Sequence, residues 1–142
     1  MIGPKPYVYF PGTAGAALSF YADVFGGTLR LHTFAEFGRA DGPADHIAHG
    51  ELAGPVALYG ADATSEQDTV SCRGLMLSLL GAADPATLAG WFDRLAQGGR
   101  IVDDLQPRPW GASDGQVVDR YGLHWLIGFE DSAVNPGTGP IA

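Results

Sequence analysis

Apolar residues in the first half of the chain follow a helical period in one segment and a strand-like pattern around it. Between Thr13 and Gly27 they recur every three or four positions, which predicts a helix with Thr13 as its N-cap and Gly26-Gly27 as its end. The buried stripe of this helix is expected to be Ala14, Ala17, Leu18, Tyr21 and Phe25. Short runs of aromatic and β-branched residues predict strands at Tyr7–Phe10, Thr28–Phe37, His46–Leu52 and Val56–Tyr59.

The second half of the chain repeats this arrangement. Asp84 is the expected N-cap of a second helix, with Pro85 at its first position and Gly98-Gly99 after its end. Its buried stripe is expected to be Leu88, Trp91, Phe92 and Leu95. The predicted strands are Leu75–Leu80, Ile101–Leu105, Gln116–Asp119 and His124–Phe129, with a loop at Pro107–Gly115.

The two halves therefore have the same order of elements, and their double glycines are 98 − 26 = 72 residues apart. This spacing indicates an internal duplication of a βαβββ unit. We predict an α+β fold in which tandem units form curved mixed sheets, a cup with the helices outside. The chain is expected to be a single domain over 1–142, with a first unit at 6–61, a linker at 62–72, a second unit at 73–129 and a flexible tail at 130–142.

Charge and cysteine content exclude several classes of partner. Sixteen acidic residues against eight basic ones give a net charge of −8, and the basic residues are scattered singly, which argues against binding to nucleic acid or an anionic membrane. No apolar run has the length of a membrane span, and the start of the chain lacks the apolar core of a signal peptide. The single cysteine, Cys72, forms no internal disulfide, so we expect a cytoplasmic protein.

Several motifs occur in one order along the chain. They are Phe20-Tyr21-x-x-Val24-Phe25-Gly26-Gly27, His49-Gly-Glu51-Leu52, Trp110-Gly111 and Asp119-x-x-Gly122-x-x-Trp125. Together with the duplicated βαβββ plan they resemble the vicinal oxygen chelate superfamily, which includes glyoxalase I, extradiol dioxygenases and bleomycin-resistance proteins. Within it the chain is most similar to the PhnB-like branch. The resemblance covers about Pro6 to Phe129 and implies a fold more firmly than a reaction.

The resemblance also implies where a metal would be held. Metal-dependent relatives use His or Glu side chains, one from each of four strands, to hold a divalent ion. The corresponding positions are Pro6 or Tyr7, Glu51, Leu75 and Leu126, so one ligand of four is present. A catalytic ion needs about three protein ligands, so we expect no metal and no other cofactor. A replacement set of His49, Glu51 and His124 is the alternative that admits a divalent metal.

Four residues are the candidates for binding a ligand in the cup: His49, Glu51, Trp110 and His124. His49 and Glu51 are two residues apart on one predicted strand, so they point to the same face. Trp110 either closes over a pocket or covers one end of the barrel as plain packing. Trp125 is expected in the core, and Asp119 is expected to cap the following turn.

Two functions follow from these observations. The first is a small-molecule-binding protein of the glyoxalase/bleomycin-resistance type, metal-free and homodimeric, for which a charge of −8 favours a cationic ligand. The alternative is a metal-assisted or acid/base enzyme, a lyase, an isomerase or a dioxygenase-like protein, acting on a small oxygenated substrate. The sequence names no substrate and assigns no catalytic residue.

Overall fold

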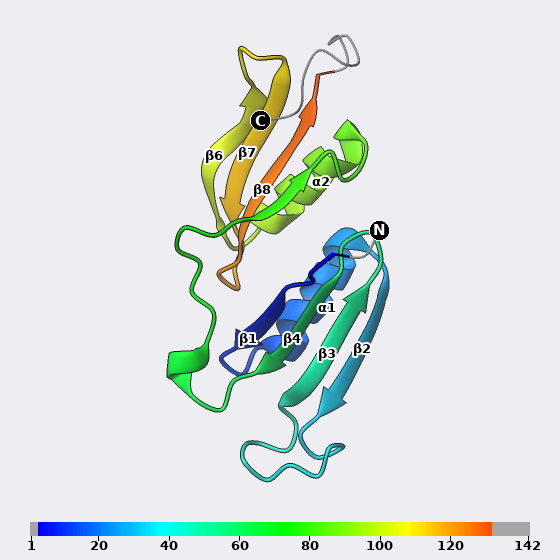
Figure 1. The fold of residues 1–142 in the computed structure, drawn as a ribbon, viewed down its shortest axis with the longest axis vertical. Helices are drawn as coiled ribbons and strands as arrows, with labels where there is room; N and C mark the ends of the chain where they lie inside the picture. Colours follow the sequence, from blue (N-terminus) through cyan, green and yellow to red (C-terminus); the bar gives the residue numbers. More distant parts are fainter. Residues whose placement is uncertain (1–2, 132–142) are drawn as a thin grey trace. The chain divides into compact units, whose positions relative to one another are not determined.

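The computed structural model describes residues 3–131, which divide into two compact units between Val70 and Ser71 (Figure 1). Each unit is one α-helix on one four-stranded mixed sheet, so the α+β fold is confirmed. The first unit contains β1 (Tyr7–Phe10), α1 (Ala14–Phe25), β2 (Thr28–Thr33), β3 (Ile47–Ala53), β4 (Leu58–Asp62) and the 3-10 helix η1 (Glu66–Asp68). The second contains β5 (Leu77–Leu80), α2 (Pro85–Ala96), β6 (Arg100–Pro107), β7 (Ala112–Val118) and β8 (His124–Glu130). None of the described helices is long and apolar enough to cross a membrane.

The two sheets have the same topology, which confirms the duplication. The strand order is β1-β4-β3-β2 in the first sheet and β5-β8-β7-β6 in the second. In each sheet the first two strands of that order are parallel and the remaining neighbours are antiparallel. The two sheets are not joined into one, and their combination into a single cup stays a prediction.

The second glycine of each pair has the same structural role. Gly27 and Gly99 both follow the helix of their unit, and each lies against the backbone carbonyl of the residue that ends the third strand of that unit, Ala53 and Val118 respectively. A Cβ atom at either position would collide with that carbonyl oxygen. The spacing of 72 therefore reflects a close approach of two backbone segments that requires glycine in both units.

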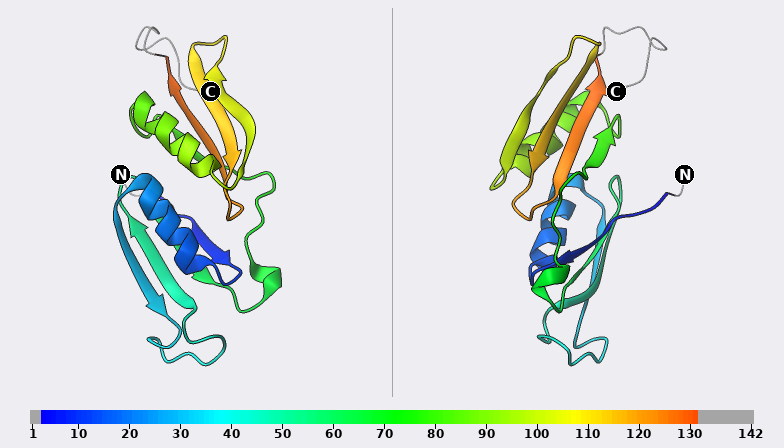
Figure 2. Two further views of the ribbon diagram at one scale, coloured as in Figure 1. Left: turned by 180° about the vertical axis from the view of Figure 1, so that it is seen from behind. Right: turned by 60° about the vertical axis from the view of Figure 1, so that its left-hand side comes forward.

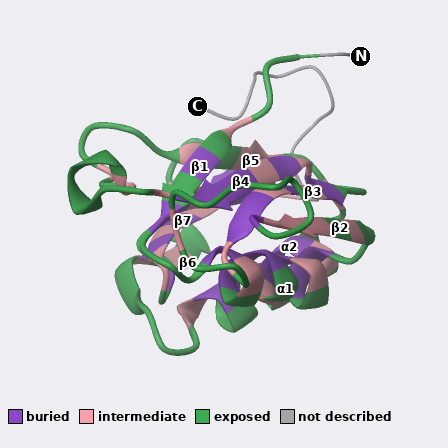
Figure 3. Cartoon of the chain, turned by 90° about the horizontal axis from the view of Figure 1, so that it is seen from below, coloured by how far each residue is buried: buried purple, intermediate pink, exposed green. Residues whose placement is uncertain are grey.

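Each helix covers one face of its own sheet and buries the stripe predicted for it (Figures 2 and 3). The buried residues of α1 are Ala14, Ala17, Leu18, Tyr21, Val24 and Phe25. Those of α2 are Leu88, Trp91, Phe92 and Leu95. The second core is completed by Trp125 and Ile127 of β8, which are 1% and 0% exposed, so the prediction of Trp125 as a core residue is confirmed.

The N-terminal caps of the two helices differ. Asp84 caps α2 as predicted, because its Oδ1 accepts a hydrogen bond of 2.9 Å from the Thr87 amide. Thr13 occupies the N-cap position of α1 as predicted, but its side chain makes no capping hydrogen bond. The Ala14 amide donates instead to Oδ1 of Asp62, at 2.9 Å, from the end of β4.

The Asp84 cap leads to a pH-dependent stability of the second unit. Hydrogen bonds from Thr87 hold the pKa of Asp84 below its usual value of 3.8. A carboxyl group with a lower pKa in the folded state stabilises fully above pH 3.8, and this contribution is lost as the pH falls through the folded-state pKa. We expect Asp84→Ala to lower the Tm at pH 6, and the difference from wild type to shrink below pH 3.8.

Tryptophan fluorescence reports unfolding of the second unit, which contains α2. All three tryptophans of the chain belong to this unit: Trp91, Trp110 and Trp125. Asp93→Ala, an exposed carboxylate later on the same helix, is the matched control. A Tm difference for Asp84→Ala that stays constant from pH 6 to pH 2.5, or that appears equally in Asp93→Ala, would contradict the capping role.

Two predicted boundaries in the first unit are wrong. β2 ends at Thr33 rather than at Phe37, because the chain turns at Phe34, whose ring is 1% exposed and lies 4.1 Å from the Arg39 guanidinium. The predicted linker 62–72 starts too early, since Asp62 ends β4 and is 3% exposed. Both corrections have one cause, which is that tertiary contacts bury residues of polar or turn-like segments.

Two boundaries in the second unit also differ from prediction. The predicted loop Pro107–Gly115 is largely strand, because β6 continues to Pro107 and β7 starts at Ala112. Ser113 and Asp114 tolerate a strand position since Ser113 donates to Asp131 and Asp114 accepts from Arg108. The predicted flexible tail 130–142 begins with Glu130, which belongs to β8, while residues 132–142 lie outside the described part of the chain.

Candidate functional site

The face of the first sheet that lies away from α1, here called the helix-free face, carries polar and aromatic side chains. Along β1, Val8 and Phe10 are 7% and 0% exposed on the α1 side, whereas Tyr7 and Tyr9 are 44% and 48% exposed on the opposite side. On β3, a Cβ atom at Gly50 would meet Leu18 of α1, so Gly50 faces the helix. Because side chains alternate along a strand, the neighbours His49 and Glu51 lie on the helix-free face.

Strand register brings residues of β1, β4 and β3 together on this face. Tyr59 of β4 is the register partner of Tyr7 on one side and of Glu51 on the other. His49 lies two residues before Glu51 on β3, and the two side chains are hydrogen-bonded. The prediction that His49 and Glu51 share one face is confirmed.

Tyr7, His49 and Glu51 form a continuous hydrogen-bonded chain. His49 Nε2 lies 3.0 Å from Oε1 of Glu51, and His49 Nδ1 lies 2.9 Å from the Tyr7 hydroxyl. An ionised carboxylate only accepts hydrogen bonds, so Nε2 carries the proton and donates to Glu51. In the neutral imidazole Nδ1 is then an acceptor, and the Tyr7 hydroxyl donates to it.

The two ends of this chain have shifted acidities. The hydrogen bond from His49 lowers the pKa of Glu51 from its usual value of 4.5. Partial burial, and then the nearby Tyr9, raise the pKa of Tyr7 above its usual value of 10.0, while Arg39 acts in the opposite direction. At neutral pH the resting state is therefore a protonated Tyr7 hydroxyl and an ionised Glu51.

Aromatic rings surround the chain. The centroid of the Tyr7 ring lies 5.6 Å from Tyr9, 5.5 Å from His49 and 6.3 Å from Tyr59. The ammonium group of Lys5 lies 5.5 Å from the centre of the Tyr59 ring and 3.4 Å from its hydroxyl. We call Tyr7, Tyr9, Tyr59 and His49 the aromatic cluster.

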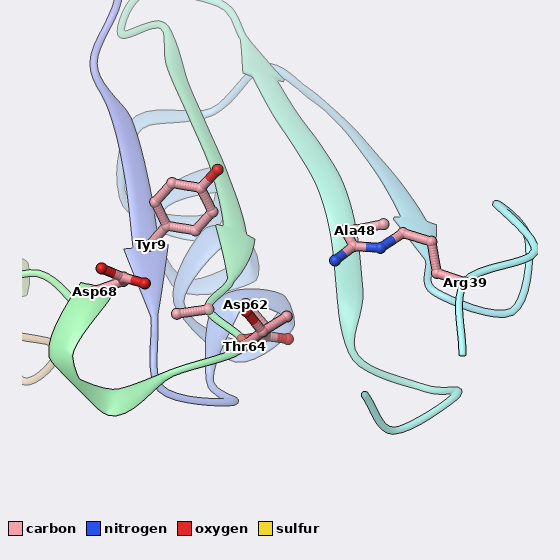
Figure 4. Close-up of a pocket in the computed structure, with 7 residues that line it drawn as sticks. Tyr9, Arg39, Ala48, Asp62, Thr64 and Asp68 are labelled. Carbon is pink, nitrogen blue, oxygen red and sulfur yellow. The ribbon is translucent and has the colours of Figure 1, made fainter. Parts of the chain in front are cut away.

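A cavity of about 340 Å³ adjoins the aromatic cluster, and Tyr9 belongs to both (Figure 4). It is lined by Tyr9, Arg39, Ala48, Asp62, Ala63, Thr64 and Asp68. Arg39 is held there by two hydrogen bonds to Asp41, of 2.9 and 2.6 Å, and these raise its pKa. The volume is at the lower end of the range for small-molecule sites, about 300–1,000 Å³.

His124 and Trp110 belong to the second unit. Nε2 of His124 lies 3.0 Å from Oε1 of Gln116 on the neighbouring strand β7. Trp110 lies in the turn between β6 and β7 and is 58% exposed, so it is not part of the second core. The structure thus brings His49 and Glu51 into contact, while a common site for all four candidates stays a prediction.

Comparison with known proteins identifies the family. The family model for the Glyoxalase/Bleomycin resistance protein/Dioxygenase superfamily matches residues 4–127, which is nearly the whole described chain. The chain belongs to this superfamily. Protein PA1353 from Pseudomonas aeruginosa, whose crystal structure is known, is 31% identical, with a TM-score of 0.73 over 93% of this chain and 100% of that one.

Three further proteins are similar to this chain at lower identity. Protein YjdN of Escherichia coli K12 is 25% identical over 135 residues, which cover 87% of this chain and 92% of YjdN. The PhnB protein from Bacillus cereus is 18% identical, with a TM-score of 0.72 over 92% of this chain and 100% of that one. Lactoylglutathione lyase from Agrobacterium tumefaciens is 19% identical, with a TM-score of 0.52 over 90% and 92% of the two chains. The last two likenesses show the fold alone.

The side chains of this member do not fit the divalent metal of its metal-dependent relatives. Of the corresponding positions, Tyr7 is a phenol that donates its proton to His49, and Leu75 and Leu126 carry no donor atom. Within residues 3–131, no three His, Cys, Asp or Glu side chains gather closely enough to hold an ion. The absence of a bound metal stays a prediction.

Sequence reasoning missed Tyr7, Tyr9, Tyr59, Lys5 and Arg39 as members of this site. Tyr7 entered only as a position without a metal ligand, although Tyr7-x-Tyr9 alternates with apolar residues in a run between two prolines. That alternation was the available signal for two tyrosines on the exposed face of a strand. Tyr59 and Arg39 had no comparable signal, since only the register of β4 and the turn after β2 place them there.

Proposed function

We propose that the chain binds a small organic molecule, without a bound metal, on the helix-free face of its first sheet. The observation that carries this proposal is that the aromatic cluster and the cavity of about 340 Å³ share Tyr9 and so offer one continuous surface. The surface combines ring faces with a few oriented polar groups, which is typical of small-molecule sites. His49 and Glu51 would contribute to its floor, and Trp110 and His124, on the second unit, are proposed as further ligand-binding residues.

A cationic or partly aromatic ligand suits this surface best. Lys5 of the chain itself already places an ammonium group 5.5 Å from the centre of the Tyr59 ring, in the geometry of a cation–π interaction. The ionised Glu51 lies on the same face, and the net charge of −8 attracts cations at longer range.

A specific observation also favours the alternative function, an acid/base enzyme acting as a lyase, an isomerase or in a dioxygenase-like way. It is the hydrogen-bonded Tyr7–His49–Glu51 chain, in which a histidine lies between a phenol and a carboxylate. We further propose that the protein belongs to the PhnB-like branch, works as a homodimer and is cytoplasmic.

A titration with benzyltrimethylammonium, a cationic aromatic probe, tests the proposed binding. Followed by NMR of the tyrosine rings, it is expected to saturate for wild type and to weaken about three- to tenfold in Tyr59→Leu, because one cation–π contact contributes about 1 kcal/mol. Tyr121→Leu, in a turn of the second unit, is the matched control and should bind as wild type does. We also expect Trp110→Ala to weaken binding.

Two further samples complete the test. The anionic aromatic toluenesulfonate should bind much more weakly than the cationic probe, and treatment with a chelator should leave the titration unchanged. Equal binding of the two probes, loss of binding after chelation, or full affinity in Tyr59→Leu would overturn the proposal.

A further inference from the structure

We infer that Tyr7, His49 and Glu51 form a proton relay, and that the Tyr7 hydroxyl is the acid–base group which this face presents to its ligand. The inference deepens the proposed function and rests on it in one respect, since the ligand bound on this face is what Tyr7 would act on. The substrate class is a small cationic or partly aromatic molecule that carries an acidic C–H or O–H bond, because the face offers ring surfaces and one proton-transferring hydroxyl.

The geometry selects Tyr7 rather than His49 as the group that meets the ligand. Both ring nitrogens of His49 are occupied, Nδ1 by Tyr7 at 2.9 Å and Nε2 by Glu51 at 3.0 Å. A histidine engaged on both sides exchanges protons with its neighbours and has no nitrogen left for a ligand. Tyr7 is 44% exposed, and its hydroxyl oxygen keeps acceptor capacity toward the open side of the sheet.

The order of the three groups gives the relay its direction. Glu51 fixes the tautomer of His49 through Nε2–H and stabilises the imidazolium that forms when Nδ1 takes a proton, in the way that a carboxylate supports histidine in hydrolytic triads. Glu51 is therefore a positioning residue, His49 the base and Tyr7 the catalytic residue. The pKa of Tyr7 is raised chiefly by burial, which keeps the hydroxyl protonated at rest, so it reacts only when His49 accepts its proton.

The proposed step is balanced without any cofactor. As a C–H or O–H bond of the ligand breaks, its proton passes to the Tyr7 oxygen and its electron pair stays on the ligand as a carbanion or an oxyanion. The original proton of Tyr7 moves at the same time to Nδ1 of His49, whose new positive charge lies beside Glu51. The reverse transfer returns a proton to the ligand and restores the relay.

Other ionisable groups within the first unit face His49 or Glu51. Tyr59 of β4 lies 5.8 Å from His49, ring centre to ring centre, and His32 of β2 is the register partner of His49. Arg30 of β2 is the register partner of Glu51, and both Arg30 and His32 favour the ionised form of Glu51. These neighbours keep Glu51 able to support an imidazolium.

The chain contains a matched internal comparison for Tyr7. Tyr9 lies on the same strand and the same face, with 48% exposure against 44%. Within residues 3–131 the Tyr7 hydroxyl has His49 as a partner, whereas no histidine hydrogen-bonds the hydroxyl of Tyr9. A difference in reactivity between the two phenols therefore reports the relay rather than exposure.

Acylation by N-acetylimidazole tests the relay on the full chain without any ligand. The phenol oxygen forms a bond to the acetyl carbon, the carbon–nitrogen bond breaks, imidazole leaves, and the phenol proton must be taken by a base. Labelling of each tyrosine is measured by peptide mass spectrometry from pH 7 to pH 9. We expect Tyr7 to react at least about tenfold faster than Tyr9 at pH 7, since general base catalysis contributes about 10²–10⁴-fold in favourable cases.

The pH profile separates the relay from a mere difference in access to the reagent. A phenol with no base beside it is acylated through its phenolate, so the rate at Tyr9 should rise steeply with pH over this range. Tyr7 has His49 beside its hydroxyl to take the proton, so the rate at Tyr7 should depend much less on pH over the same range. A structural role for the hydrogen bonds would leave both tyrosines with the same steep profile.

Three variants complete the test. His49→Gln keeps a hydrogen-bond partner for Tyr7 but accepts no proton, so it should reduce the Tyr7 rate to that of Tyr9 and restore the steep profile. Glu51→Gln should reduce the Tyr7 rate several-fold, and His46→Gln, a histidine that packs against Phe34 outside the relay, should leave it unchanged. A steep profile for wild-type Tyr7, or a rate unaffected by His49→Gln, overturns the relay. Because no ligand is present, this failure is distinct from failure of the probe titration.

Discussion

Replacing Trp125 with alanine is expected to lower the free energy of unfolding of the second unit by about 3–5 kcal/mol, the usual cost of removing a buried tryptophan. The indole is 1% exposed on β8, and its Nε1 donates a hydrogen bond of 2.8 Å to Asp119. The substitution thus leaves a large void and also removes one of the groups that Asp119 binds. The other oxygen of Asp119 accepts from the amides of Tyr121 and Leu123, which confirms the prediction that it caps this turn.

Urea unfolding followed by tryptophan fluorescence measures the effect, because Trp91 and Trp110 remain in the same unit as reporters. Trp110→Ala is the matched control, and with 58% exposure it should change stability by less than about 1 kcal/mol. A larger loss of stability in Trp110→Ala than in Trp125→Ala would show that the assignment of core and surface tryptophans is reversed.

The second large effect is expected for Asp62→Ala, which should destabilise the first unit by about 2–4 kcal/mol. Asp62 is 3% exposed, and its two oxygens accept from the amides of Ala14, at 2.9 Å, and Ile47, at 2.8 Å. Alanine leaves both amides without this acceptor, and each unsatisfied buried group costs about 1–3 kcal/mol. The neighbouring cavity lets water reach the two amides and replace part of the lost hydrogen bonding. We therefore expect a smaller loss of stability than the full cost of two unsatisfied amides.

Hydrogen exchange measures this effect at the two backbone amides that Asp62 binds. The amides of Ala14 and Ile47 should exchange far faster in Asp62→Ala, and the first turn of α1 should lose protection with them. Asp68→Ala, an exposed acid that lines the same cavity, is the control and should stay within about 0.5 kcal/mol of wild type. Unchanged protection of both amides in Asp62→Ala would contradict the bridging role of this carboxylate.

The site was only partly predictable from the sequence. A separation of two residues on a strand was enough to place His49 and Glu51 on one face, because strand side chains alternate. The third member of the relay, Tyr7, is 42 residues from His49 in the chain and reaches it across β4. No local pattern contains that neighbour, because the parallel pairing of β1 with β4 is a long-range contact.

What the sequence determined by itself is the set of features that depend on near neighbours along the chain. Helical periodicity, the Asp84 cap and the double glycines predicted both helices, and the spacing of 72 predicted the repeated unit, because each of these is a local backbone or side-chain requirement. Only the tertiary structure decided the cap of α1, the burial of Asp62 and the start of β7 at Ala112. In these places a polar residue favours a turn by its own chemistry, but a hydrogen-bond partner distant in sequence holds it in ordered structure. The free energy of that contact exceeds the local preference for a turn.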